Sequence, residues 1–346
     1  MKTLFKKIFI LIGLLFFCFA PAATAEQRII TGAQSKISLK MEPGYPKPHE
    51  NVHFVLESFS TDLNMATVQW FVDGKPVKSG KALLEFDVTV GGLGSKTEVR
   101  AAVASTNIGS LPVTVTLQPA QVDLIWQSHS YTPAFYRGKA YLTQKSGALI
   151  VAMPSFITTS GVLLDPQDLI YTWTVDTVVK GDKSGRWKNT FRVDDVSIVR
   201  GDKMVQVLVK APSTALAASQ TIIVAMEMPI LAFYEHDPLE GIKYNRALKG
   251  TYKLVNEEVT IEAVPYFFST PYKETAELSY GWNLNGKAIE TQETKHGAVT
   301  LRQTGESGYA TLNLNVHHVR NPLEAVFGKL VLEFGGTNNI AFPSAP

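Results

Sequence analysis

A tryptophan-centred alternation of apolar and polar residues occurs three times along the chain. Each copy reads apolar-x-Trp-x-apolar and is followed by Asp or Asn. The copies are Val68–Asp73, Tyr171–Asp176 and Tyr280–Asn285. Because successive side chains of a strand point to opposite faces, each tryptophan shares a face with its two apolar neighbours. The pattern therefore predicts three half-buried strands whose structural core residues are Trp70, Trp173 and Trp282.

The residues after each copy predict the turn that follows the strand. Asp73-Gly74 and Asn285-Gly286 favour the positive φ angles of a two-residue hairpin turn. The second copy has Thr177 in place of that glycine and continues through Lys180–Arg186. We therefore expect a longer hairpin in the second repeat.

The spacing of the repeats indicates the size of the folding unit. The tryptophans lie 103 and 109 residues apart, close to the ~100 residues of one immunoglobulin-type sandwich. An alternating strand precedes each tryptophan, at Val52–Leu56, Leu149–Met153 and Val259–Ala263. Another follows it, at Val99–Val103, Val205–Val209 and Ala310–Val316. This order predicts an all-β chain of three tandem immunoglobulin-like β-sandwich domains.

The units resemble bacterial Ig-like and PKD-type modules, which lack the disulfide that often bridges the two flanking strands. The arrangement is also similar to a family of exported proteins from ultra-small candidate-phylum bacteria. The segments that carry this second resemblance are Glu50–Ser58, Thr61–Asn64 and Tyr131–Tyr136. That family has no assigned activity, so the resemblance implies secretion and the repeated sandwich, but no functional residue.

The N-terminus predicts export. Three lysines among the first seven residues precede the uncharged run Ile8–Ala20, and Ala23 and Ala25 follow it. This is the pattern of a signal peptide, residues 1–25, cleaved before Glu26. A retained anchor helix is the weaker alternative, because a helix that spans a bilayer needs ~20 apolar residues.

The repeats divide the rest of the chain into domains. The expected limits are 36–118, 119–229 and 230–346. Two similar segments, Val122–His129 and Pro229–His236, are each interpreted as the last strand of a domain running into an aromatic linker. Pro133 and Pro238 stiffen these linkers, which indicates a semi-rigid rod.

Cysteine and charge exclude several classes of protein. Cys18 is the only cysteine, and the bulky residues Leu15–Phe17 ahead of it do not match a lipoprotein signal. The mature chain then has neither disulfides nor a cysteine nucleophile. The full chain has 33 basic and 31 acidic residues, and removal of the three N-terminal lysines leaves 30 basic against 31 acidic residues. The net charge is then close to zero, so no attraction to nucleic acid is expected. No later segment is long and apolar enough for a transmembrane helix.

Three histidine-containing segments are candidate chemical sites. His49-Glu-Asn-Val-His53 has the spacing of a zinc protease motif, but that motif requires a helix. This segment reads as a strand, where residues four apart are ~13 Å apart, too far to share one metal. His317-His318 point to opposite strand faces. Glu235–Asp237 is the better metal candidate because a linker can turn, although capping and solvation explain it more simply. We expect no catalytic residue, no metal and no cofactor.

The remaining tryptophans, Trp126 and Trp187, lie outside the repeated pattern. Trp187 stands between Arg186 and Lys188 in the longer hairpin of the second repeat. An exposed tryptophan among polar groups suits sugar stacking or a protein hot spot, and the ring could equally cover its own sandwich. We therefore expect a non-enzymatic extracellular or cell-envelope interaction protein with a candidate binding surface at Trp187. Its partner is an envelope or extracellular protein or a glycan, and the alternative is a carbohydrate-binding accessory protein.

Overall fold

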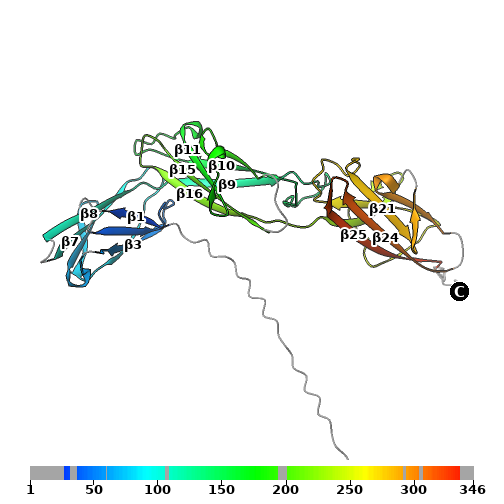
Figure 1. Cartoon of the computed structure of the whole chain (residues 1–346), viewed down its shortest axis with the longest axis horizontal. Coiled ribbons are helices and arrows are strands. Elements are labelled where there is room, and N and C mark those ends of the chain that lie inside the picture. The colour runs from blue at the N-terminus through cyan, green and yellow to red at the C-terminus, as the bar shows by residue number, and fades with distance from the viewer. Residues whose placement is uncertain are drawn as a thin grey trace, which may run out of the picture.

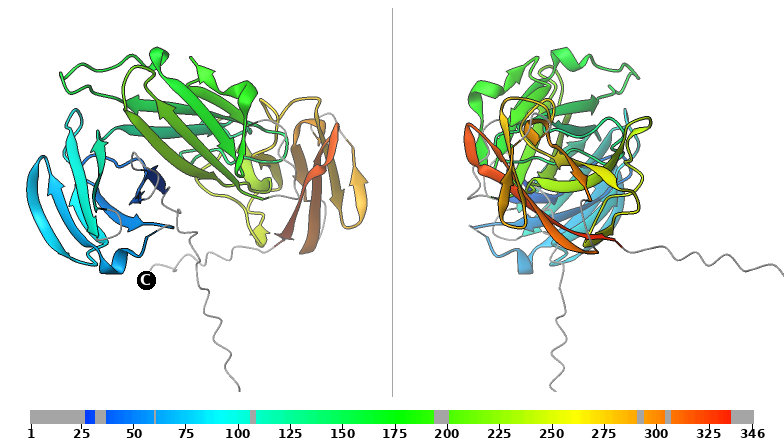
Figure 2. Two further views of the ribbon diagram at one scale, coloured as in Figure 1. Left: turned by 60° about the vertical axis from the view of Figure 1, so that its left-hand side comes forward. Right: turned by 90° about the vertical axis from the view of Figure 1, so that its right-hand side faces the viewer.

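The computed structural model describes residues 27–31, 37–59, 61–105, 109–193, 201–290, 294–303 and 307–335. The expected signal peptide and Cys18 lie outside these residues. Regular structure within them is β-strand, with short 3-10 turns. Figures 1 and 2 show three β-sandwiches that follow one another along the chain, and we call them domains 1, 2 and 3.

Domain 1 contains two sheets. The first has the order β1-β2-β3-β6, formed by β1 (Arg28–Thr31), β2 (Ser38–Glu42), β3 (Asn51–Glu57) and β6 (Glu85–Thr89). The second has the order β5-β4-β7-β8, formed by β4 (Thr67–Val72), β5 (Lys75–Lys81), β7 (Thr97–Ser105) and β8 (Gly109–Leu117). β1 therefore precedes residue 36, where the sequence placed the start of this domain.

Domain 2 repeats this arrangement. Its first sheet, β14-β10-β9, is formed by β9 (Gln121–Ser128), β10 (Ala148–Ser155) and β14 (Thr190–Val193). Its second sheet, β12-β11-β15-β16 with β13 also on β11, is formed by β11 (Ile170–Val175), β12 (Val178–Val179), β13 (Gly185–Arg186), β15 (Lys203–Lys210) and β16 (Ala217–Val224).

Domain 3 has the same framework with extra edge strands. Its first sheet, β18-β17-β20-β23, is formed by β17 (Ile230–Asp237), β18 (Gly241–Ile242), β20 (Glu258–Tyr266) and β23 (Ala298–Arg302). Its second, β19-β25-β24-β21-β22, is formed by β19 (Thr251–Lys253), β21 (Leu278–Leu284), β22 (Lys287–Ile289), β24 (Gly308–His318) and β25 (Asn321–Phe334). The chain is thus all-β, with tandem immunoglobulin-like sandwiches.

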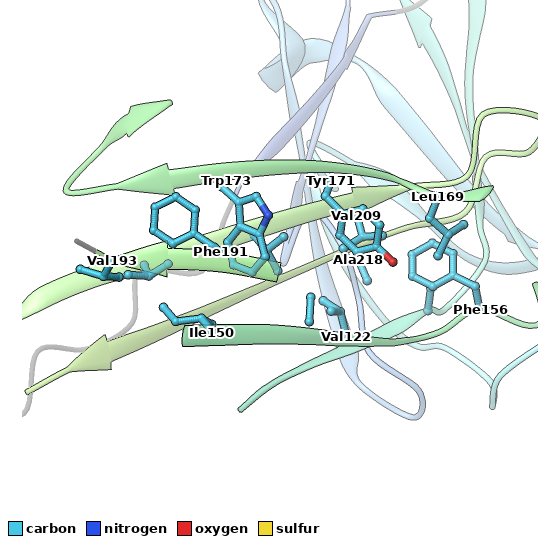
Figure 3. Packing of buried hydrophobic residues seen from close by; sticks show 14 of the residues in the cluster. Val122, Ile150, Phe156, Leu169, Tyr171, Trp173, Phe191, Val193, Val209 and Ala218 are labelled. Atoms are coloured by element: carbon cyan, nitrogen blue, oxygen red, sulfur yellow. The ribbon is translucent and has the colours of Figure 1, made fainter. Parts of the chain in front are cut away.

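Each sandwich has its own hydrophobic core, and the repeated tryptophan lies in it. Trp70, Trp173 and Trp282 are at most 2% exposed. In domain 2 the Trp173 ring stacks on Phe191 from the opposite sheet, with ring centroids 5.3 Å apart (Figure 3). In domain 1 the Trp70 ring stacks on Phe86, 5.0 Å away. Burial of such large rings against the opposite sheet provides much of the driving force for each sandwich.

The turn after the tryptophan strand is a two-residue hairpin in all three domains. In domain 2, Val175 pairs directly with Val178, and the two residues between them have φ of 47° (Asp176) and 72° (Thr177). The longer hairpin expected for this repeat is therefore wrong. The extra residues lie further on, between β12 and β13, where the returning strand is interrupted by the 3-10 turn Gly181–Lys183.

The Asp or Asn that ends each pattern bonds to the neighbouring strand. Its backbone N–H donates to a carbonyl of that strand, and its side-chain Oδ1 accepts the N–H of the same residue. The residue pairs are Asp73 with Glu98, Asp176 with Met204, and Asn285 with Thr311, and the Oδ1 to N distances are 2.8, 3.2 and 2.7 Å. The side chain thus continues the ladder where the backbone turns away, which explains why each repeat carries an Asp or Asn here.

Thr177→Gly should stabilise domain 2. A β-branched residue at φ 72° is in the left-handed region, where strain costs about 1–3 kcal/mol, whereas glycine adopts it freely. Glycine also loses more chain entropy than threonine on folding, which offsets part of this relief. We therefore expect the free energy of unfolding to rise by about 1 kcal/mol, measured by urea unfolding. The reciprocal control is Gly74→Thr in domain 1, where φ is +78° and a Cβ meets nothing within 4 Å. Because the added side chain meets no neighbour, a loss of stability in Gly74→Thr would report backbone strain alone. If both variants were as stable as the native chain, this explanation would be contradicted.

The strands at the domain junctions have a different role from the one expected. β9 pairs with β10 and β17 pairs with β20, so each is the first strand of the domain that follows. The interpretation of Val122–His129 and Pro229–His236 as last strands is wrong. The aromatic segments after them are connections inside domains 2 and 3, because strand pairing places β9 and β17 in the downstream sheets.

No helix in the described part of the chain has the length and apolar character needed to cross a membrane.

Candidate functional site

Trp187 lies where the chain of domain 2 passes from one sheet to the other. Just before it, Arg186 on β13 pairs with Ile170 of β11. Just after it, the Asn189 carbonyl accepts the N–H of Ala152 on β10, at 2.8 Å. The backbone is therefore held by one sheet on each side of Trp187.

The core tryptophan of domain 2, Trp173, holds this crossing in place by hydrogen bonds. The Trp173 Nε1–H donates to the Lys188 carbonyl at 2.8 Å, and the Trp173 backbone N–H donates to Ser184 Oγ at 2.9 Å. The Lys180 N–H donates to the Trp173 carbonyl at 2.8 Å, and Ser184 Oγ donates to the Lys180 carbonyl at 2.7 Å. The excursion from β12 to Lys188 is thus held by the backbone and the indole N–H of the fully buried Trp173.

The Trp187 side chain itself is 68% exposed, and its φ is 65°. The ring therefore does not complete the core of its own sandwich, the alternative that the sequence left open. A large side chain at positive φ is uncommon, because this conformation brings Cβ close to the following carbonyl oxygen.

Domain 1 builds the same crossing with a small residue. Ala82 has φ of 52°, the next carbonyl, that of Leu83, accepts Trp70 Nε1–H at 3.0 Å, and the Leu84 carbonyl accepts the Leu56 N–H at 2.9 Å. Ala82 is thus the counterpart of Trp187. Since the backbone forms equally well with alanine, the fold does not require a tryptophan at position 187.

The neighbours of Trp187 are also exposed. Arg186 and Lys188 both lie at the surface, whereas Leu83, the counterpart of Lys188, packs against the core of domain 1. Among the described residues, neither Arg186 nor Lys188 takes part in an ion pair. The other tryptophan outside the pattern, Trp126, is covered by Lys139, whose Nζ lies 3.5 Å from its ring centroid.

The histidine segments singled out in the sequence make contacts with nearby residues. His49 has φ of 61° at the turn before β3, and His53 lies on β3 with Nδ1 2.9 Å from Asp87 Oδ1. His318 is buried at the end of β24, and its Nδ1 accepts the Arg320 N–H at 3.1 Å. In the residues that the structure describes, no group of three or more His, Cys, Asp or Glu side chains is placed to hold a metal ion.

The acidic segment after the second junction binds a lysine. Glu235 and Asp237 lie 3.1 and 3.3 Å from Lys243 Nζ, and Tyr252 donates to Glu235 at 2.9 Å. Hydrogen bonds from the Leu239 and Glu240 amides, with that of Lys243, hold the pKa of Asp237 below its ordinary value. Glu235, Asp237 and Tyr252 line an open hollow of about 230 Å³ at the end of β17.

A buried ion pair that sequence reasoning missed lies beside this segment. Lys273 and Glu262 are 6% and 4% exposed and are hydrogen-bonded, and His236 Nδ1 lies 3.0 Å from the other oxygen of Glu262. Burial alone would lower the pKa of Lys273, but the hydrogen bond and charge of Glu262 outweigh it and raise that pKa. The two residues are 11 positions apart in different elements, so no spacing rule pointed to them.

The loop that carries Lys273 also joins domain 3 to domain 2. The Tyr131 N–H donates to the Phe268 carbonyl and the Phe267 N–H donates to the Tyr131 carbonyl, both at 2.7 Å. The Tyr136 ring meets those of Tyr266 and Phe267, with centroids 5.7 and 5.6 Å apart. Tyr131–Tyr136, expected to link domains 1 and 2, is thus a connection within domain 2 that contacts domain 3.

No family model matches the chain, and no curated protein matches it. Among solved structures it is similar to three N-terminal domains of the highly immunogenic outer capsid protein of bacteriophage RB49 (11% identity, 89% of this chain and 99% of that chain, TM-score 0.26). It is also similar to the fibronectin(III)-like modules of Clostridium thermocellum CbhA (11% identity, 55% and 94%, TM-score 0.26). A third similarity is to SGBP-B of the Bacteroides ovatus mixed-linkage glucan utilization locus, solved with a heptasaccharide (11% identity, 86% and 70%, TM-score 0.22). No functional residue is transferred from these proteins.

Proposed function

We propose that this chain is a non-enzymatic interaction protein, a semi-rigid rod of immunoglobulin-like domains that presents a binding surface at Trp187. The observation that carries the proposal is the exposed Trp187 ring on a backbone that domain 1 builds with Ala82. Exposed aromatic anchors on rigid backbone lose little entropy on binding, which is why tryptophans concentrate binding energy.

Contacts at both junctions support a semi-rigid rod. Between domains 1 and 2, Lys47 Nζ donates to Gln220 Oε1 at 2.8 Å, and a Cβ placed on Gly94 would lie 3.1 Å from the Thr158 carbonyl oxygen. Between domains 2 and 3, the paired backbones of Tyr131 and Phe267 act like a β-bridge. These contacts are what supports restricted bending at each joint, since relative motion of neighbouring domains is otherwise the default.

Export of the protein from the cytoplasm is part of the same proposal. The N-terminal lysines, the apolar run Ile8–Ala20 and the small residues after it support export to the cell envelope or the extracellular space. The domain limits 36–118, 119–229 and 230–346 and the resemblance to exported proteins of candidate-phylum bacteria also remain predictions.

Trp187→Ala should weaken capture of the native partner at least tenfold while the thermal unfolding of domain 2 changes little. The ring is exposed, and Ala82 shows that alanine fits this backbone. The measurement is a pull-down from native envelope material, quantified against protein concentration, together with calorimetry of the variant.

The matched control is Tyr309→Ala on β24 of domain 3, because Tyr309 is also an aromatic residue and is also 68% exposed. Capture by this variant should equal that of the native chain. Equal losses for Trp187→Ala and Tyr309→Ala, or unchanged capture by Trp187→Ala, would contradict a specific surface at Trp187.

A further inference from the structure

The strand register places two cations, Arg186 and Lys210, in one row on the outer face of domain 2, and Trp187 directly follows Arg186 in the chain. Arg186 pairs with Ile170, and Ile170 pairs on its other side with Lys210, so the three lie on one row across β13, β11 and β15. Tyr171 and Trp173 point into the core, so the alternate residue Ile170 and its row face outwards. At ~4.8 Å between neighbouring strands, the Cα atoms of Arg186 and Lys210 are about 10 Å apart.

This end of the face carries three exposed cations. Lys188 adds a third exposed cation next to Trp187, and none of the three cations forms an ion pair with an acidic side chain in the described ranges. The matching row of domain 1 holds Lys81, Thr67 and Ala104, so it has one cation instead of two. The charge is therefore a property of domain 2 and not of the repeated framework.

Away from the cations, the outer face carries hydroxyl and amide groups together with the apolar side chains of Leu208 and Val179. The next two rows are Thr172, Leu208, Ser219 and Thr174, Gln206, Thr221. Hydrogen-bonding groups on a strand surface, together with the exposed indole that follows Arg186, match a sugar chain, which offers hydroxyls at its edges and C–H groups on its ring faces.

The edge of the sheet is poorly suited to a protein strand. β12 and β13 have two residues each, and the 3-10 turn Gly181–Lys183 separates them. An added peptide strand needs a continuous row of free backbone groups, which this interruption removes. Contact must therefore be made through side chains.

We infer that this outer face of domain 2 binds an anionic polysaccharide. Trp187 stacks on a sugar ring, while Arg186, Lys188 and Lys210 contact its carboxylate or sulfate groups. The inference rests on the proposed function, because it names the partner of the same surface.

The test is a titration of the purified protein with polygalacturonate, with neutral dextran and poly-L-glutamate as comparison polymers. Polygalacturonate should bind, dextran should bind at least tenfold more weakly, and rising salt should weaken the interaction. Trp187→Ala, Arg186→Ala and Lys210→Ala should each reduce affinity about tenfold. Lys81→Ala, the counterpart of Arg186 in domain 1, is the matched control and should change nothing.

The outcomes separate this inference from the proposed function. Equal binding of poly-L-glutamate, insensitive to Trp187→Ala, would overturn the inference because charge alone would explain binding. The inference would also be overturned if the protein bound no polysaccharide while Trp187→Ala still weakened capture of the native partner. In that case the proposed function would stand. If Trp187→Ala changed neither measurement, both would fail.

Discussion

Trp173→Ala is expected to destabilise domain 2 by about 3–5 kcal/mol, because removal of a fully buried ring leaves a cavity between the two sheets. The change also removes the indole N–H that binds the Lys188 carbonyl, so the excursion that carries Trp187 loses its side-chain anchor and keeps only the backbone hydrogen bonds of residue 173. Two effects should therefore appear together, a lower unfolding temperature for domain 2 and faster cleavage of the excursion.

Calorimetry and limited trypsin digestion measure these two effects. Trypsin reports the anchor directly, because Lys183, Arg186 and Lys188 all lie in the excursion. Trp173→Phe is the control, since it keeps most of the ring but not the N–H donor, and it should loosen the excursion with a smaller loss of stability. Unchanged unfolding of domain 2 in Trp173→Ala would show that Trp173 does not support this core.

Lys273→Met is expected to destabilise domain 3 by about 3–5 kcal/mol. Removing one partner leaves Glu262 buried without its cation, and an uncompensated buried charge is strongly unfavourable. The loop concerned also carries Phe267, whose N–H donates to the Tyr131 carbonyl, so the joint between domains 2 and 3 should loosen as well. Urea unfolding measures the first effect and small-angle scattering the second.

A double variant separates the buried charge from the loss of packing. Glu262→Leu with Lys273→Met should recover most of the stability, because an apolar pair of similar volume often replaces a buried ion pair at little cost. Lys243→Met is the matched control. Its side chain is 32% exposed and pairs with Glu235 at the surface, where solvent screens the pair, so its loss should cost much less stability than the loss of Lys273. Equal effects of Lys273→Met and Lys243→Met would contradict the special role of the buried pair.

Rising pH should weaken the buried pair. Because the folded protein raises the pKa of Lys273, its contribution to stability is complete below the ordinary lysine value of ~10.4 and is lost as pH rises through the higher folded value. Deprotonation of Lys273 then leaves Glu262 buried without a counter-charge. This weakening occurs only in strongly alkaline solution, so the Lys273–Glu262 pair is intact near neutral pH.

Local patterns along the chain predicted the repeated framework. The alternation around Trp70, Trp173 and Trp282 is a period-2 signal, and it depends only on which side chains share a strand face. The all-β, tandem immunoglobulin-like fold followed from three such signals at regular spacing. Trp187 was also a candidate from the sequence, because it lies outside the repeated strand pattern and stands between Arg186 and Lys188.

Partner choice between strands was predicted less well. The segments around Val122 and Ile230 were placed at the ends of the preceding domains, whereas they pair with β10 and β20. An isolated strand sequence has the same alternation whichever sheet it joins, so the pattern cannot distinguish the two. The turn at Thr177 was missed because a glycine was expected, although pairing of the flanking strands is sufficient to hold threonine at positive φ.

The sequence by itself determined the number of sandwiches, their central tryptophans and the inserted residues of the second repeat, because all three are properties of neighbouring residues. Only the tertiary structure decided that Trp187 is exposed on an anchored crossing, that Lys210 lies in the row of Arg186, and that Lys273 meets Glu262. Each of these depends on residues brought together by strand pairing and sheet packing. Such contacts arise from the free energy of the whole sandwich and leave no periodic signal in the chain.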